Sequence, residues 1–153
     1  MNSSFQYPVA SFQTGYWLLE TGNCFPTMKL RIKSNSIRLR LLRSEVEKFA
    51  AAGQISEEIE FGTDRSSYLR YSLVTSPAAE SIAARFSGNE IAIVVPIAIA
   101  NKWTSSDEVG FECEHPIGGD ESLKILVEKD FECIDRPDDP DRADAYPNPN
   151  VTC

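Results

Sequence analysis

Short runs of alternating apolar and polar residues recur along this chain, and a period of two is typical of β-strands. Residues 29–42 contain two such runs, whose apolar members are Leu30 and Ile32, then Ile37, Leu39 and Leu41. The Ser-Asn-Ser segment at 34–36 separates the runs and has the composition of a turn. The pattern therefore predicts a β-hairpin.

A helical pattern follows the hairpin. Ser44 can cap a helix, Glu47 three residues later can complete a capping box, and Gly53 can end it. The predicted buried stripe consists of Val46, Phe49 and Ala50. Two further strands are predicted near residues 57–61 and 69–74, which gives the order ββαββ.

The same order recurs later in the chain. A constant shift of 54 residues sets 30–74 beside 84–128 without a gap, and it matches apolar positions such as Phe49 with Trp103 and Ile55 with Val109. In this second copy Gly88-Asn89 is the turn, Pro96 opens the helix, and strands are predicted at 109–113 and 123–128. Strand 91–95 is apolar on both faces, which predicts a central position.

These elements predict a β-rich α+β fold. Two tandem ββαββ repeats, residues 28–75 and 82–130, form one domain over 28–134, packed as a pseudo-twofold barrel or sandwich. Residues 135–153 form an acidic, proline-rich, extended tail, which Tyr146 anchors and whose acids fold over the basic hairpin. Residues 1–27 fit neither copy. They are either an extension from a mis-assigned start, with Met28 as the native start, or an accessory arm.

Two resemblances bear on this interpretation. The segments "MKLRIKSNSIRLRL", "VEKDFECIDR" and "YPNPN..C" resemble a family of small uncharacterised bacterial proteins that begin near Met28, and this resemblance implies no activity. The doubled ββαββ order is also similar to the swapped-hairpin units of AbrB-type proteins and to the MraZ proteins. That similarity rests on Gly88, "IAIVVP" ending in Pro96, the helix after it and the Gly118-Gly119 turn, and it implies DNA binding.

Charge divides the chain into two halves. The net charge is −8, but residues 28–75 hold nine Lys or Arg against six Asp or Glu, whereas residues 76–153 hold six against sixteen. An acidic protein of this kind is not a general nucleic-acid binder, although a local basic face can still act over about 10 Å. The longest apolar run, 91–100, is too short to span a membrane. With no signal-peptide pattern and no CxxC pair among four cysteines, we expect a cytoplasmic protein with free thiols.

The basic residues of the hairpin are the sharpest charge feature. They are Lys29, Arg31, Lys33, Arg38, Arg40 and Arg43. Strand alternation places the first three on one face and Arg38 and Arg40 beside them, which suits phosphates or an acidic partner. A solvated face, or one that pairs with the acidic second half of the chain, is the alternative.

Metal and nucleophile candidates are sparse. His115 is the only histidine, and it could join Cys113 and Cys133 as zinc ligands; Cys133 and Cys153 could also be linked through a disulfide or a metal. A buried thiol and a surface histidine are the simpler interpretation. We therefore expect no cofactor and no catalytic residue.

Taken together, the residues favour a non-enzymatic binding or interaction module with a protein partner or a second copy. A DNA-binding regulator that uses the basic hairpin is one alternative, and a cysteine- or metal-dependent enzyme is the other.

Overall fold

The computed structural model describes residues 27–133, 135–136 and 138–149. Their elements follow in the order β1 (Lys29–Ile32), β2 (Ser36–Leu41), α1 (Arg43–Ala52), β3 (Gln54–Glu60), β4 (Tyr68–Ser76), β5 (Ala83–Ser87), β6 (Glu90–Pro96), α2 (Ile97–Thr104), β7 (Gly110–Gly118), β8 (Glu121–Lys129) and the 3₁₀ turn η1 (Pro140–Ala143). The predicted accessory arm and Cys153 lie outside the described residues. None of the helices in these ranges is long and apolar enough to cross a membrane.

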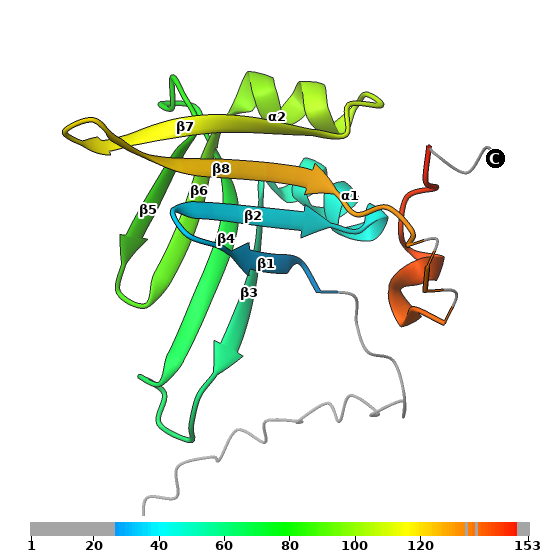
Figure 1. Ribbon diagram of the computed structural model, residues 1–153, viewed down its shortest axis with the longest axis horizontal. Helices are drawn as coiled ribbons and strands as arrows, with labels where there is room; N and C mark the ends of the chain where they lie inside the picture. Colours follow the sequence, from blue (N-terminus) through cyan, green and yellow to red (C-terminus); the bar gives the residue numbers. More distant parts are fainter. Residues whose placement is uncertain (1–26, 134, 137, 150–153) are drawn as a thin grey trace, which may run out of the picture.

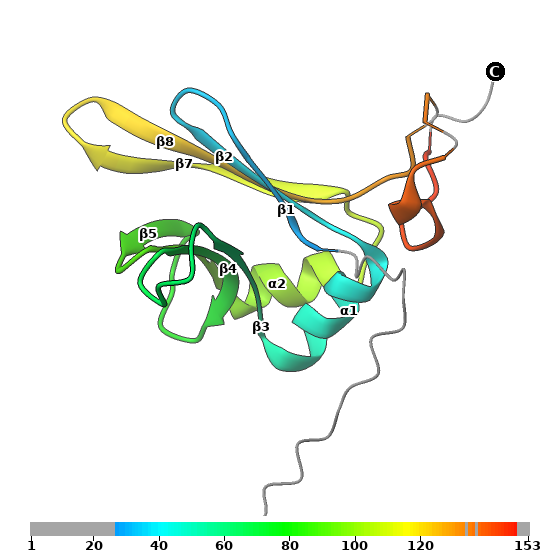
Figure 2. The same cartoon turned by 90° about the horizontal axis from the view of Figure 1, so that it is seen from below.

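The strands form two four-stranded sheets. Sheet A has the order β1-β2-β8-β7 and sheet B the order β3-β4-β6-β5. In each sheet the central pair is parallel, β2 with β8 and β4 with β6, and the outer pairs are antiparallel. Figure 1 shows the strands of sheet A running across those of sheet B, and Figure 2 shows sheet A on one side with sheet B and both helices on the other. The fold is β-rich as predicted, but within the described ranges neither sheet closes into a barrel.

Alternation decides which face of each strand is buried. On β2 the side chains of Ile37, Leu39 and Leu41 are buried, whereas Arg38 and Arg40 between them are half-exposed. The predicted hairpin at 29–42 is therefore confirmed. The apolar strand β6 lies between β4 and β5, which is the central position predicted for it.

Helix α1 begins two residues earlier than predicted, and its capping box uses Glu45 instead of Glu47. Leu42 precedes its first turn, and the Leu42 backbone N–H donates to Glu45 Oε2 at 2.8 Å. The predicted cap at Ser44 with Glu47 is thus wrong, because Ser44 already lies inside the helix. Gly53 ends the helix as predicted, with a φ of 71° that an L side chain rarely adopts.

Both helices contribute an aromatic ring to the core. Trp103 of α2 is fully buried, with ring centroids 6.3 Å from Phe49 of α1 and 5.3 Å from Phe111 of β7. Pro96 precedes α2, which confirms the predicted start of that helix. Ala50, predicted to be buried, is exposed, so the apolar stripe of α1 consists of Val46 and Phe49.

The tail docks where sheet A meets α1. The backbone N–H of Tyr146 donates to the Asp130 carbonyl at 2.8 Å, and the N–H of Glu132 donates to the Tyr146 carbonyl at 2.9 Å. The Tyr146 ring lies 5.9 Å from that of Phe131. These contacts confirm Tyr146 as an anchor, while η1 interrupts the extended course predicted for the tail.

Candidate functional site

The predicted cations gather on the outer face of sheet A. The β1–β2 register sets Lys29 opposite Arg40 and Arg31 opposite Arg38, so that their side chains share one face, as predicted. On β8, Lys124 lies opposite Ser36 and extends this face by one strand. We call these residues the cationic face: Lys29, Arg31, Lys33, Arg38, Arg40 and Lys124.

Glu128 neutralises the middle of the cationic face. The parallel β2–β8 register sets it opposite Arg40, whose Nε donates to Glu128 Oε1 at 2.6 Å. An Nη of Arg38 donates to the same oxygen. The Nε of Arg38 is buried and has no hydrogen-bond partner among the described residues. Arg38 and Arg40 are therefore held in place by the sheet itself.

Asp130, directly after β8, and Asp141 of the tail neutralise one end of the cationic face. Lys29 Nζ lies 2.7 Å from a carboxylate oxygen of Asp130 and 2.9 Å from one of Asp141. Partial burial would lower the pKa of Lys29, but its hydrogen bonds to the two aspartates outweigh that effect and raise the pKa above its usual value. The predicted folding of tail acids over the hairpin is thus found at Lys29.

Arg43 contacts the tail and is not part of the cationic face. It lies in the first turn of α1, where its Nη2 donates to the Ala145 carbonyl at 3.2 Å and its guanidinium lies 5.7 Å from the Tyr146 ring centroid. Sequence grouped Arg43 with the hairpin cations, but the structure places it in this structural contact.

Three members of the cationic face lie outside its ion pairs. Within the described residues, Arg31, Lys33 and Lys124 form no ion pair. They surround a shallow hollow whose lining is completed by Ser36, Ile37, Arg38, Glu112 and Leu126. Sequence analysis did not identify Lys124 as a member of this face, because only the pairing of β2 with β8 brings it next to the hairpin. This hollow can attract an anion through Arg31, Lys33 and Lys124, and the opposing charges nearby are Glu112 in its lining and Glu114 opposite Lys124.

The outer face of sheet A changes sign at its far edge. Glu112 and Glu114 on β7 lie opposite Leu126 and Lys124 of β8, so they share the outer face with the cations. Because neighbouring strands are about 4.8 Å apart, the cationic face spans only about 10 Å across β1, β2 and β8. A broad anionic surface laid across the sheet would meet these glutamates.

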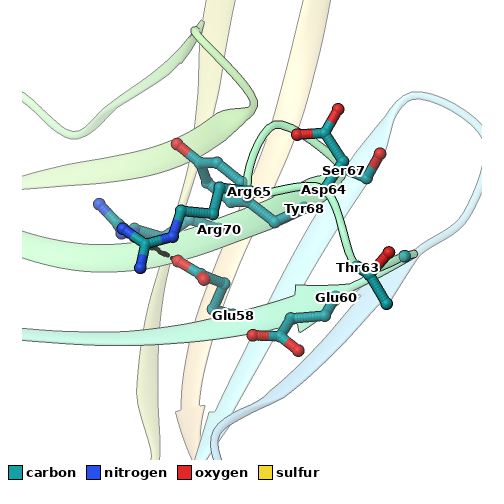
Figure 3. Close-up of a pocket in the computed structure, with 9 residues that line it drawn as sticks. Glu58, Glu60, Thr63, Asp64, Arg65, Ser67, Tyr68 and Arg70 are labelled. Carbon is teal, nitrogen blue, oxygen red and sulfur yellow. Dashed lines mark hydrogen bonds and ion pairs between the residues drawn. The ribbon is translucent and has the colours of Figure 1, made fainter.

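A second hollow lies beside the β3–β4 loop (Figure 3). Two cations line it, Arg65 and Arg70. Arg70 is already paired, because its Nη2 donates to Glu58 Oε2 at 2.8 Å while its guanidinium lies 5.6 Å from the Tyr68 ring centroid. Asp64 accepts hydrogen bonds from Ser66, which lower the pKa of its carboxyl group and fix the loop. We interpret this hollow as loop architecture.

The cysteine and histidine candidates are spread apart along the chain. Cys113 and His115 lie two residues apart on β7, Cys133 lies exposed beyond β8, and Cys153 lies outside the described residues. The Cys113 thiol donates to the Ile82 carbonyl at 3.7 Å, and burial raises its pKa. The described part of the chain brings no three His, Cys, Asp or Glu side chains into a group that could hold a metal ion.

Comparison with known proteins gives one match. A model of a family of unknown function (DUF7009) matches residues 28–150. No curated protein and no solved structure matches significantly.

Proposed function

Because this chain belongs to the family of unknown function DUF7009, its role has to be inferred from its geometry, and we propose that it is a non-enzymatic module that binds an acidic protein partner on the cationic face. The observation that carries the proposal is the contrast within that face. Lys29, Arg38 and Arg40 form ion pairs inside the fold, whereas Arg31, Lys33 and Lys124 form none within the described residues.

The distribution of charge favours a narrow partner over duplex DNA. Glu112 and Glu114 border the cationic face, and the whole protein carries a net charge of −8. Both would repel a phosphate backbone that ran across the sheet. DNA binding, which the similarity to AbrB-type proteins implies, is the alternative that the experiment below separates.

The environment of Cys113 supports a role without catalysis. Nucleophilic use of a thiol needs a lowered pKa and a neighbouring base. Burial instead raises the pKa of Cys113, whose thiol is engaged by a backbone carbonyl. The proposal places the protein in the cytoplasm, where such thiols stay reduced.

The proposal also treats the fold as two ββαββ repeats about a pseudo-twofold axis. It is supported by strand registers that agree at a shift of 54 residues: Ile37 pairs with Ile125 in sheet A as Tyr71 pairs with Ile91 in sheet B. Each sheet takes one hairpin from either half, as swapped-hairpin units do.

The registers of β3–β4 and β7–β8 indicate where the alignment of the two proposed repeats needs a gap. Ile55 lies opposite Leu73, and Phe111 lies opposite Val127, so Phe111 rather than Val109 corresponds to Ile55. Val109 is 49% exposed, which fits a position outside the repeat. Two additional residues between the start of α2 and β7 account for the offset.

The test is binding of labelled poly-L-glutamate to the full chain, measured by fluorescence anisotropy over a salt titration. Arg31→Glu combined with Lys33→Glu should weaken binding at least tenfold, because it reverses two charges that lie outside the ion pairs of the cationic face. A matched control, Arg85→Glu combined with Lys48→Glu, makes the same change in net charge at exposed sites elsewhere and should change binding by less than threefold.

A parallel arm replaces poly-L-glutamate with duplex DNA. Tighter, steeply salt-dependent DNA binding that the Arg31 and Lys33 substitutions abolish would replace the proposal with the DNA-binding alternative. Equal losses in the two double variants would show that net charge alone governs binding, and the assignment of the cationic face would then fail.

A further inference from the structure

Strand β1 leaves one edge of sheet A open. Lys33 and Ser36 exchange both backbone hydrogen bonds, at 3.2 and 3.1 Å, so bonded pairs fall on alternate residues back to Arg31 and Lys29. Leu30 and Ile32 between them direct their N–H and C=O groups away from β2. Within the described ranges no hydrogen bond from another element reaches these groups. An unpaired edge of this kind is a template for another strand.

Exposed apolar side chains lie on the core side of this edge and on the core-facing side of sheet B. Ile32 points toward the core side of sheet A but is 57% exposed. Figure 1 shows the β3–β4 hairpin and the β5–β6 turn extending past β1. Ile55 of β3 and Ala84 of β5 pack against the core. Strand alternation puts Ile59 on the same face as Ile55 and Phe86 on the same face as Ala84. Ile59 is nevertheless 43% exposed and Phe86 76% exposed. The core-facing surface of sheet B therefore stays partly uncovered where its strands extend past β1.

The opposite side of the same edge carries positive charge. Arg31 and Lys33 alternate with Leu30 and Ile32 along β1 and face outward, without an ion pair among the described residues. A strand added at this edge would continue both surfaces, with every second side chain over the apolar surface and the others beside Arg31 and Lys33.

We propose that the β1 edge accepts an extended segment of a partner protein as a fifth strand of sheet A, in which apolar residues alternate with Asp or Glu. Backbone hydrogen bonds to Leu30 and Ile32 would supply affinity, and the alternation would supply specificity. This inference rests on the proposed function and gives the acidic partner its form. Two copies of this chain cannot pair through their β1 edges without bringing like charges together, which favours a different protein as the occupant.

The experiment measures binding of a labelled eight-residue peptide of alternating Ile and Glu to the full chain. A peptide of the same composition, with the four Glu before the four Ile, is the control for pattern. Two further peptides carry N-methyl groups on the amides of either the Ile or the Glu residues. Methylation of the Ile amides removes antiparallel pairing with Leu30 and Ile32, and methylation of the Glu amides removes parallel pairing. We expect one of these two peptides to bind at least tenfold more weakly than the unmethylated one.

A variant of the protein tests the same edge. Ile32→Pro removes an outward N–H without removing a β1–β2 hydrogen bond, and edge strands tolerate proline in that position. It should bind the alternating peptide at least tenfold more weakly than Ile32→Ala, which shortens the side chain but keeps the N–H. Circular dichroism of both variants verifies the fold.

The outcomes separate the two proposals. If the alternating peptide, the peptide with four Glu before four Ile and both methylated peptides bind equally well, and poly-L-glutamate also binds, strand addition is overturned. The cationic face then remains as an electrostatic site. If neither poly-L-glutamate nor any of the peptides binds, both the proposed function and strand addition are overturned. Concentration-dependent self-association that the alternating peptide reverses, seen by light scattering, would assign the edge to a second copy and overturn the inference of a separate partner.

Discussion

Asp144 caps helix α1 through Ser44, a residue 100 positions earlier in the chain. The Ser44 backbone N–H donates to Asp144 Oδ1 at 3.0 Å, and the Ser44 hydroxyl donates to the other carboxylate oxygen. The Arg43 N–H donates to the Asp144 carbonyl at 2.9 Å. The tail thus satisfies amides that every helix leaves open at its first turn.

Asp144→Ala should therefore destabilise the protein by about 1 kcal/mol, because it removes a helix cap and the negative charge at the positive end of the helix. Urea unfolding followed by circular dichroism measures the change. Asp138→Ala, at an exposed acid of the same tail, is the control and should leave the midpoint unchanged. Equal midpoints for the two variants would show that the tail does not cap α1.

Glu45 should make stability fall as pH rises. Glu45 is only 1% exposed, and this burial raises the pKa of its carboxyl group to about 7. The charges of Glu57 and Asp144 also raise the pKa, whereas the hydrogen bond from the Leu42 N–H and the charge of Lys48 lower it. Between pH 4.5 and 7 the folded state keeps a proton that the unfolded state releases, so folding loses about 3 kcal/mol across this window.

The Glu45→Gln variant tests this pH dependence. Urea unfolding from pH 4 to 8 should show the downward slope in the wild type and in Glu47→Gln, an exposed acid of the same helix, but not in Glu45→Gln. A wild-type slope that Glu45→Gln retains would assign the pH dependence to other groups.

Trp103 should be the most sensitive position of the core. Trp103→Ala removes a fully buried ring between Phe49 and Phe111 and should cost about 3–5 kcal/mol in the free energy of unfolding. Ile97→Ala, on the same helix but 40% exposed, should cost less than about 1 kcal/mol. Thermal and urea unfolding give both values, and similar costs would contradict the packing described for α2.

Two glycines should respond to alanine for different reasons. At Gly110 an added Cβ would lie 2.9 Å from Glu128 Cβ and closer still to the Val127 carbonyl oxygen, so Gly110→Ala should cost about 1–3 kcal/mol by overpacking. At Gly88 there is open space but a φ of 55°, so Gly88→Ala should cost about 1 kcal/mol through backbone strain. Urea midpoints rank the two, and a smaller loss at Gly110 would contradict the close β7–β8 approach.

Local pattern was enough to find the hairpin and to place Arg31 beside Arg38, because both follow from strand alternation and a short turn. It could not show that Glu128 neutralises Arg38 and Arg40, since that contact depends on a parallel pairing between distant strands. It also placed the cap of α1 at Ser44, whereas the residue that precedes the first turn is Leu42. Local pattern missed this because Asp144, a residue of the tail, accepts the hydrogen bond of the Ser44 amide.

The parallel pairing of β2 with β8 also sets the order of events during synthesis. The hairpin that carries all of the cationic face except Lys124 is complete at Leu41, but its partner strand ends at Lys129. At a ribosomal rate of roughly 5–20 residues per second, the hairpin waits roughly 4–18 seconds for β8 to emerge. During that interval Leu39 and Leu41 have no β8 beside them, so the nascent chain is most exposed to chaperones and to aggregation before its last strand arrives.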